Sequence, residues 1–341
     1  HDLLTLRDKK VQVDLAILDF SKAFDTVPHD RLLGKLEHYG INGPILKWIS
    51  MFLKHREQRV VVGGVASSPT SVDSGVPQGT VLGPLLFLLH INDMPQVVSS
   101  QVRLFCRRLS ALPYYPWYRE DQIILQRDLD LLSKWGDTWG MKFNASECNI
   151  MRISRSRTAF TQFYQLGGHI LDEVDQAKYL GISIASELEW STQTACSVRK
   201  ANSALGFVKR NLKSCPAQLK ETAYISMVRS LLEYGGTVWD PHLKKDIAAL
   251  ESVQRRAARF VKHDYRSTSS VTAMLQDLGW KNLADRRKDL RLALLFKIVH
   301  GHVKVSADTL GLKPPTRSTR AQHQHKFQIP RATTNELKHS F

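Results

Sequence analysis

The sequence has few cysteines, and they lie far apart. No Cys-x-x-Cys pair occurs and no histidine stands at the spacing of a shared metal site around the four, which are Cys106, Cys148, Cys196 and Cys215. Neither a zinc site nor a disulfide framework is indicated, and this usage fits a reducing compartment. We therefore expect an intracellular protein.

Long apolar runs are also missing. No run could span a bilayer and no segment is organised like a signal peptide, so we expect no membrane partner. Internal repeats are absent, and nothing in the sequence points to a protein partner. Because the first residue is His1 and not methionine, we expect a fragment of a longer polypeptide.

Acidic residues are scarce relative to basic ones. The 341 residues include 48 Lys and Arg against 32 Asp and Glu, which gives a formal net charge of +16. This excess indicates a polyanionic partner more readily than a neutral metabolite, although a basic surface can also serve solubility alone. At 43% hydrophobic residues, the chain has enough apolar material for two or three packed units.

An alternating apolar stretch near the start of the chain ends in a single acid. Val11, Val13, Leu15 and Ile17 alternate, and the run stops at Asp19. The pattern predicts a buried strand that carries one carboxylate at its C-terminal end. A carboxylate there is costly unless it is exposed or balanced by a metal ion, which favours a catalytic strand. The alternative is an acid that caps the turn before the next helix.

Two segments carry a family resemblance. Leu18–Asp25 (LDFSKAFD) and Ser74–Thr80 (SGVPQGT) resemble motifs A and B of reverse transcriptases of non-LTR, LINE-type retrotransposons, within them the jockey/CR1-like elements. The resemblance covers nearly the whole chain. It implies an α+β fold: a fragment of a right-hand polymerase palm, with an antiparallel sheet and packed helices, followed by an all-α thumb-like region. The implied activity is RNA-directed DNA polymerisation.

The resemblance also implies partners and site residues. The partners would be an RNA template, a DNA primer and deoxynucleoside triphosphates, with Mg²⁺ as cofactor and the nucleus favoured over the cytoplasm. Asp19 would be the catalytic metal ligand, and the Phe20 carbonyl a weaker second one. Phe24 would lie under the sugar of the nucleotide, Gln78 would touch its sugar and base, and Gly79 would let the backbone approach it.

Between the two motifs the pattern predicts two helices and a hairpin. Pro28 suits a first helical turn and Gly40 a helix end, and a second helix follows Gly43. The pair Gly63–Gly64 then separates two runs with strand character within residues 58–72, which predicts a hairpin.

The motif expected next is altered. The family continues with a hairpin carrying Phe-Ala-Asp-Asp, whose two acids complete the metal site, but here Phe105 is followed by Cys106–Leu109 (CRRL). Arg107 and Arg108 thus replace the acidic pair. The exchange changes the local charge by about four units, at separations where each unit pair is worth on the order of 1–4 kcal/mol. We expect metal occupancy to collapse; the other acids that could substitute are Asp14, Asp25 and Asp93.

The genetic code offers a cause. The codons GCA GAC GAC TG-, which spell Ala-Asp-Asp-Cys, read as Cys-Arg-Arg-Leu after insertion of one T. Ser110–Tyr118 has no hydrophobic periodicity, and a regular helical pattern of apolar residues resumes near Glu120. We hypothesise a frameshift after which the original reading frame is later restored; a splice junction could give the same protein sequence. Finding no insertion or deletion at this locus would rule out the frameshift. We expect the central hairpin to be missing, which would leave a neighbouring strand edge poorly paired.

Two later segments resemble further motifs. In Trp139–Cys148, similar to motif D, Glu147 stands where the family has a lysine, and Lys142 is out of register. The motif E turn, which grips the primer end in the family, would be formed by Lys178, Tyr179, Leu180 and Gly181. A plain strand and turn is the alternative reading.

The remainder is helical with basic faces. Arg255, Arg256 and Arg259 lie opposite an apolar stripe, as phosphate contacts to a duplex require, although a solvated surface gives the same pattern. The expected domains are a partial palm at 1–155, a motif E strand and turn at 156–189, a thumb-like region at 190–311 and a basic, disordered tail at 312–341.

Three functions remain open on the sequence. The first is an active polymerase, although the fingers that precede motif A are not in the chain. The second is a catalytically inactive, nucleic-acid-binding remnant of that enzyme, and the third a structural helical protein. The lost acidic pair favours the second.

Overall fold

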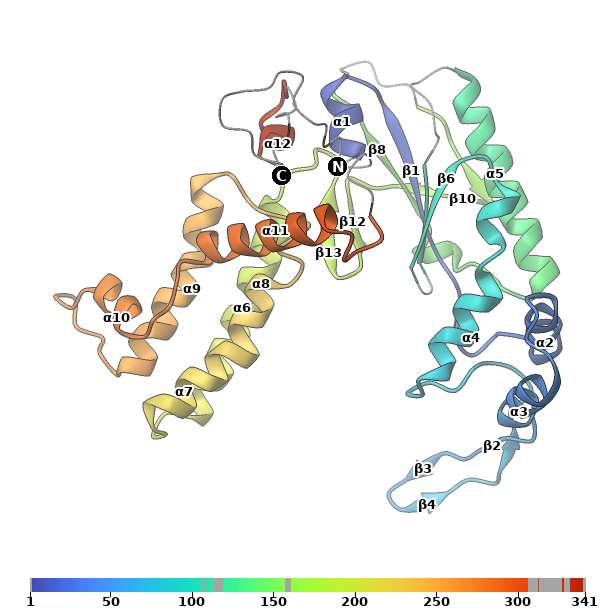
Figure 1. Cartoon of the computed structure of the whole chain (residues 1–341), viewed down its shortest axis with the longest axis horizontal. Coiled ribbons are helices and arrows are strands. Elements are labelled where there is room, and N and C mark those ends of the chain that lie inside the picture. Colours follow the sequence, from blue (N-terminus) through green and yellow to red (C-terminus); the bar gives the residue numbers. More distant parts are fainter. Residues whose placement is uncertain are drawn as a thin grey trace. The chain divides into compact units, whose positions relative to one another are not determined.

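The computed structural model divides the chain into two compact units (Figure 1). Residues 10–177 form the sheet unit, and residues 1–9 with 178–341 form the helical unit. The structure describes residues 2–105, 108–112, 119–156, 161–305, 312, 327 and 332–339, without the side chains of residue 2 and of residues 103–121. Cys106 and Arg107 lie outside the described residues, as does most of the predicted tail at 312–341.

The sheet unit is built on a five-stranded sheet in the order β11-β8-β1-β7-β6. Its strands are β1 (Val13–Asp19), β6 (Gln101–Phe105), β7 (Arg108–Leu112), β8 (Asn149–Ile153) and β11 (Asp172–Glu173). The central strand β1 runs antiparallel to both β7 and β8, and only the short β11 pairs in parallel, with β8. All seven residues of β1 are buried, as their alternation and apolar content predict.

The expectation that the central hairpin is missing is wrong. β6 and β7 pair with each other over five residue pairs, and β7 also pairs with β1. The ladder hydrogen bonds join backbone groups, so an altered side-chain sequence does not prevent them. No strand edge is therefore left open beside β1.

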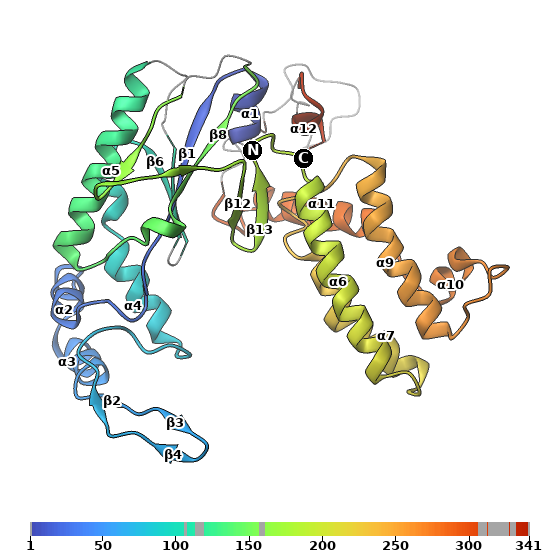
Figure 2. The ribbon, with the colours of Figure 1, turned by 180° about the vertical axis from the view of Figure 1, so that it is seen from behind.

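Helices cover the sheet unit. Figures 1 and 2 show α4 and α5 along the sheet, and their buried side chains, among them Phe87 and Leu132, share one core with Leu18 and Phe20 of the β1 end. The bounds are α2 (His29–His38), α3 (Gly43–Leu53), α4 (Leu82–Ile91), α5 (Arg119–Trp139), and the 3₁₀ turns η1 (Met94–Val97) and η2 (Ala145–Glu147). α2 and α3 confirm the predicted pair of helices.

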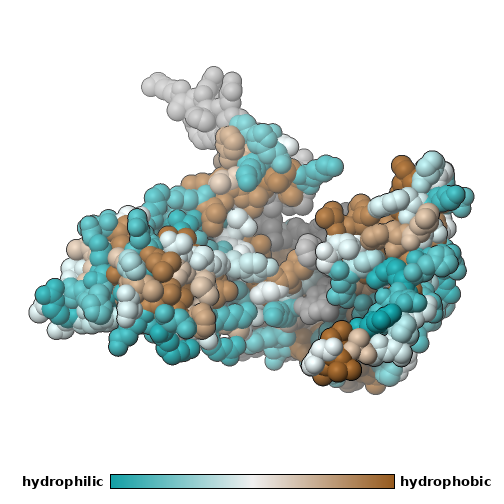
Figure 3. Space-filling view, turned by 90° about the horizontal axis from the view of Figure 1, so that it is seen from below, coloured by the Kyte–Doolittle hydropathy of each residue, from teal (hydrophilic) through white to brown (hydrophobic). Residues whose placement is uncertain are grey.

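The predicted hairpin between the motifs is confirmed. β2 (Glu57–Gln58) pairs with β5 (Thr70–Ser71), and β3 (Val61–Val62) pairs with β4 (Val65–Ala66). Gly63 and Gly64 both have positive φ, which suits the tight turn between β3 and β4. Val62 and Val65 are 72% and 75% exposed, and in Figure 3, viewed from the side on which this hairpin projects, hydrophobic atoms lie at its tip. A small hairpin, β9 (Gln165–Leu166) with β10 (His169–Ile170), completes the unit.

The helical unit has its own core. Its buried side chains include Leu205 and Leu250 of two long helices and Trp239 of the loop between residues 234 and 243. The bounds are α1 (Asp2–Asp8), α6 (Ser191–Asn211), α7 (Ala217–Ala223), the π-helix η3 (Tyr224–Arg229), α8 (Ser230–Glu233), α9 (Lys244–Lys262), α10 (Val271–Asp277), α11 (Leu283–Val299) and α12 (Asn335–Lys338). A hairpin of β12 (Gln176–Tyr179) and β13 (Ile182–Ala185) precedes α6, so the described unit is mostly, not wholly, helical.

The fold class is α+β, as predicted: a mainly antiparallel sheet with helices comes first, and a mostly helical region follows. In the described part of the chain, every helix is too short or too polar to cross a bilayer.

Candidate functional site

Asp19 is fixed at the C-terminal end of β1 by its backbone. The carbonyl oxygen of Asp19 accepts a hydrogen bond from the Asn144 N–H at 2.8 Å, and its own N–H donates to the Cys148 sulfur at 3.4 Å. The residue is only 2% exposed. Burial raises the pKa of the Cys148 thiol to about 11, so the group beside Asp19 is a neutral thiol at ordinary pH. The structure therefore holds this acid in a closed, tightly connected position.

The residue opposite Asp19 across the sheet is Arg108. The β1–β7 register pairs these two residues directly, beside the pair Leu18 and Leu109. Side chains of directly opposed residues start about 4.5–5.5 Å apart at their β-carbons. The backbone thus places an arginine position next to the acid, where the resemblance led us to expect a second carboxylate.

Two of the other candidate acids, Asp14 and Asp93, are engaged with buried cations, whereas Asp25 is exposed. Asp14, 1% exposed, accepts from Arg152 Nε at 3.2 Å and from the Tyr164 hydroxyl at 2.7 Å. Asp93 accepts from Lys35 Nζ at 2.6 Å. Within the described residues, no three His, Cys, Asp or Glu side chains are grouped closely enough to hold a metal ion. In the part of the chain whose side chains are described, oxygen ligands for a pair of Mg²⁺ ions are thus not gathered around Asp19.

The two phenylalanines of motif A join an aromatic cluster. Phe20 is 3% exposed and stacks on Phe143, with ring centroids 4.6 Å apart. Phe24 packs against Phe87 of α4 at 4.9 Å and is only partly buried. Phe24 is therefore the ring of the two that retains some exposure, as a contact to a nucleotide sugar would require.

The motif B loop is tied to motif A through Gly75. The Gly75 N–H donates to the Val27 carbonyl at 2.8 Å, and the Val76 N–H donates to the Phe24 carbonyl at 2.7 Å. Gly75 has φ +88°, and a β-carbon there would lie 2.8 Å from the Asp25 α-carbon. Only glycine fits this approach. Gly75 is one of the two glycines that shape this loop, and its close approach to motif A is a contact that the sequence did not predict.

Gln78 and Gly79 occupy the open end of the same loop. Gln78 Nε2 donates to Asp25 Oδ1 at 3.0 Å, so the Gln78 side chain of motif B directly contacts Asp25, the last residue of motif A. Gly79 has φ +77°, and nothing lies within 4 Å of where its β-carbon would be. Motifs A and B are thus brought together; contact with a nucleotide stays a prediction.

The motif D and motif E positions lie on turns. Glu147 is exposed on η2. Lys178 and Tyr179 end β12, and Leu180 and Gly181 form the turn with φ of 50° and 83°. The Tyr234 hydroxyl donates to the Leu180 carbonyl at 2.9 Å and supports this turn, a partner that sequence spacing gave no reason to suspect. The strand and turn are confirmed; the primer contact stays a prediction.

The three arginines of α9 have different surroundings. Arg255 and Arg256 are exposed, and Arg256 donates to Asn202 Oδ1 of α6 at 2.6 Å. Burial and the nearby Arg256 charge lower the pKa of Lys209 on α6, which marks a cluster of like charges. Arg259 instead donates to the Arg266 carbonyl at 2.8 Å and thereby fixes the loop after α9.

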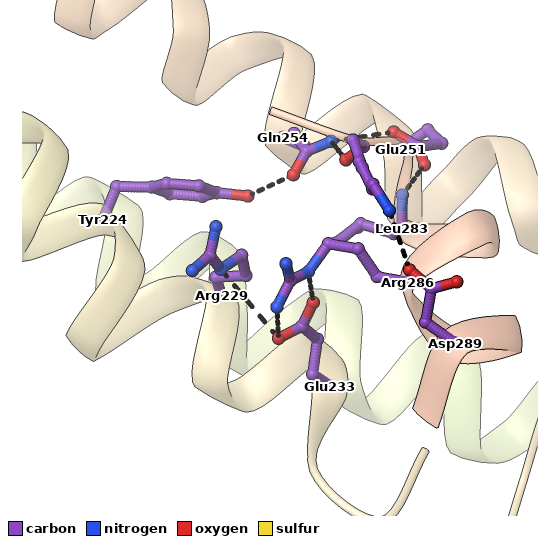
Figure 4. A network of polar contacts seen from close by, with 9 residues as sticks. Tyr224, Arg229, Glu233, Glu251, Gln254, Leu283, Arg286 and Asp289 are labelled. Atoms are coloured by element: carbon purple, nitrogen blue, oxygen red, sulfur yellow. Dashed lines mark hydrogen bonds and ion pairs between the residues drawn. The ribbon is translucent and has the colours of Figure 1, made fainter. Parts of the chain in front are cut away.

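Arg286 of α11 takes part in a network of polar contacts inside the helical unit (Figure 4). Arg286 forms a two-pronged ion pair with Glu233 of α8, and Glu233 also lies 3.9 Å from Arg229 Nε. In the same network the Tyr224 hydroxyl donates to Gln254 Oε1 at 3.0 Å. These contacts join α8, α9, α11 and η3, so Arg286 is a structural residue.

Comparisons of the sequence and the structure relate the chain to known proteins. The family model for "Reverse transcriptase (RNA-dependent DNA polymerase)" matches residues 3–184. The chain is 26% identical to the RNA-directed DNA polymerase from mobile element jockey of Drosophila melanogaster, over 92% of this chain and 36% of the relative. It is also 26% identical to the probable RNA-directed DNA polymerase from transposon BS of the same species, over 76% of this chain and 30% of that relative.

The chain thus spans about a third of these relatives, between 30% and 36% of their length. Among solved structures, telomerase from Candida tropicalis with a fragment of telomeric RNA aligns with 87% of this chain and 44% of its own, at 9% identity and a TM-score of 0.44. Because the family model covers more than half of the sequence and includes motifs A and B, the chain belongs to the reverse transcriptase family and contains a reverse transcriptase domain of the non-LTR retrotransposon type.

Proposed function

We propose that this chain is a nucleic-acid-binding member of its family that does not catalyse nucleotidyl transfer. The observation that carries the proposal is the β1–β7 register, which sets Arg108 opposite Asp19. The family's reaction relies on two divalent ions clamped by clustered acids. Here one acid faces one arginine position, and Arg107 is the preceding residue.

The donor set does not fit a pair of Mg²⁺ ions. Mg²⁺ requires near-octahedral oxygen ligands, and guanidinium groups supply none. Asp14 and Asp93 are held by Arg152 and Lys35, so recruiting either acid would take a carboxylate away from a buried cation. We therefore assign no polymerase step to Asp19.

Charge supports the binding half of the proposal. The formal net charge is +16, and Arg255 and Arg256 are exposed on α9 beside Lys209 of α6. A polyanion that binds such a cluster neutralises its like charges and thereby relieves the repulsion between them. We infer that this cluster contacts the phosphates of a primer–template duplex, with RNA as template and DNA as primer.

Primer extension tests the proposed lack of catalytic activity. With an RNA template, a DNA primer, deoxynucleoside triphosphates and Mg²⁺ or Mn²⁺, we expect no extension by the whole chain. Extension that Asp19→Ala abolishes would establish the competing function, an active RNA-directed DNA polymerase, and overturn the proposal.

Fluorescence anisotropy of a labelled RNA–DNA duplex tests the binding half. We expect affinity to fall with salt, and the double variant Arg255→Gln, Arg256→Gln to bind more weakly with a shallower salt dependence. Lys47→Gln combined with Lys134→Gln is the matched control, because both lysines are exposed on helices of the sheet unit, α3 and α5, and the total charge change is the same. No binding by the parent, or equal loss in the control, would contradict this assignment.

A further inference from the structure

A basic cavity lies between α11 and α12 of the helical unit. It has a volume of about 330 Å³, within the range of ~300–1,000 Å³ usual for small-ligand sites. Its lining consists of Lys288, Arg291, Leu292, Leu295, Lys338 and His339. We call it the α11–α12 pocket. In the described part of the chain, none of the residues that line it is acidic.

The spacing on α11 explains one wall. Lys288, Arg291, Leu292 and Leu295 follow one another at intervals of three, one and three residues, which places them on one face of the helix. This face is cationic at its N-terminal end and apolar beyond it. A ligand with an anionic group joined to a flat apolar group would match both halves.

Arg291 contributes positive charge that its partner does not cancel. Arg291 Nη2 lies 2.7 Å from Asp240 Oδ2, while Arg287 Nε lies 2.6 Å from Oδ1 of the same carboxylate. Two guanidinium groups therefore share one acid, and one positive charge remains in excess. Lys288 and Lys338 are exposed and add to it.

The second wall carries an oriented aromatic ring. The His339 ring stacks on His242 with centroids 5.1 Å apart and planes at 8°. The His339 carbonyl also accepts from Arg291 NH1 at 3.4 Å, which joins the two walls. His339 lines the pocket together with Leu292 and Leu295, where a planar base could pack.

This second wall is anchored by α1, from the other end of the chain. Asp8 Oδ1 accepts from the backbone N–H groups of Thr333 at 2.8 Å and Thr334 at 2.6 Å, and Arg7 NH1 lies 3.4 Å from Glu336. The wall is thus held in place by an acid that does not line the pocket.

We propose that the α11–α12 pocket binds a nucleotide unit, with the phosphate against Lys288, Arg291 and Lys338 and the base against His339 and the two leucines. The site is separate from Arg255 and Arg256, and binding in it does not depend on the duplex contacts proposed above. A free mononucleotide and one residue of an RNA single strand share this chemistry.

Anisotropy of a fluorescently labelled adenosine nucleotide, titrated with the whole chain, tests the proposal. We expect saturable binding that weakens by about tenfold in Lys288→Gln and in Lys338→Gln, since each variant removes a charged hydrogen-bond donor. Lys297→Gln, on the same helix but outside the pocket, should bind like the parent. Equal loss in Lys297→Gln, or no loss in the two pocket variants, would overturn the proposal.

Asp8→Ala, which removes both the acceptor oxygen and the negative charge, separates a built pocket from general charge attraction. The variant makes the chain more positive, so nonspecific binding of an anion would strengthen, whereas release of the second wall should weaken binding in the pocket. Unlabelled AMP or short single-stranded RNA should compete with the labelled nucleotide, while adenosine without phosphate should not. The stronger competitor of the two identifies whether the natural ligand is a free nucleotide or an RNA strand. Stronger binding by Asp8→Ala, or competition by adenosine equal to that of AMP, would contradict the proposal. Arg255→Gln with Arg256→Gln should leave nucleotide binding unchanged even if it alters duplex binding.

Discussion

Asp19 and Arg108 are directly opposed partners in the ladder between β1 and β7. The pairing follows from backbone hydrogen bonds that a changed side chain leaves intact, so the strand scaffold of the site persists while its charge is altered. The scaffold and the chemistry of the site are thus separable. The predictions below test first the scaffold and then the charge.

Gly75 should be far less replaceable than Gly79. Both have positive φ, which costs a non-glycine residue about 1–2 kcal/mol, but only at Gly75 would a new β-carbon meet backbone, at 2.8 Å. We expect Gly75→Ala to lower the free energy of unfolding by roughly 1–3 kcal/mol more than Gly79→Ala, the cost of overpacking. Urea unfolding of the two variants measures the difference, and equal losses would show that the loop can move aside.

Stability should depend on pH through His90. This side chain is fully buried on α4, and burial, followed by the Lys35 charge, lowers its pKa from 6.5 to about 4. Between pH 6.5 and 4 the unfolded chain binds a proton that the folded chain does not. His90 therefore destabilises the folded state as the pH falls through this window, by up to roughly 3 kcal/mol, and has no such effect above it.

Urea unfolding at a series of pH values measures this effect. His90→Gln cannot titrate, so its unfolding free energy should change less between pH 6.5 and 4 than that of the parent. Parallel curves for the two proteins would argue against a buried, neutral His90.

Cys148 should be unreactive in the folded protein. Its thiol is 1% exposed and its pKa is raised to about 11 by burial, whereas Cys196 and Cys215 are partly exposed. Iodoacetamide at neutral pH, followed by peptide mass spectrometry, should modify Cys148 only after unfolding. Rapid labelling of Cys148 in the native protein would mean that the end of β1 opens readily.

Local patterns predicted much of the fold. The alternation that ends at Asp19, the Gly63–Gly64 pair and the helix after Pro28 each correspond to an element of the structure, because strand, turn and helix signals act over a few residues. The contact between the motif A and motif B loops, made by Gln78 and Asp25 at 3.0 Å, was not among these predictions.

Other features depend on distant partners and could not be predicted in this way. Arg108–Leu112 has little strand pattern of its own, yet pairs on both sides because β1 and β6 supply backbone partners. Arg259 and Arg286 have the spacing of a basic surface, but their guanidinium groups are taken up by carbonyls and by Glu233. The contact of Asp8 with Thr333 joins residues 325 positions apart.

Binding of Mn²⁺ followed by electron paramagnetic resonance is the most direct test of the central claim, that Arg107 and Arg108 have removed the metal site. Three proteins suffice: the parent, the double variant Arg107→Asp, Arg108→Asp, and that double variant with Asp19→Asn added. We expect the parent to bind no Mn²⁺ that depends on Asp19, the double variant to gain such binding, and Asp19→Asn to abolish the gain. Two Mn²⁺ ions bound to the parent and lost on Asp19→Asn would contradict the account.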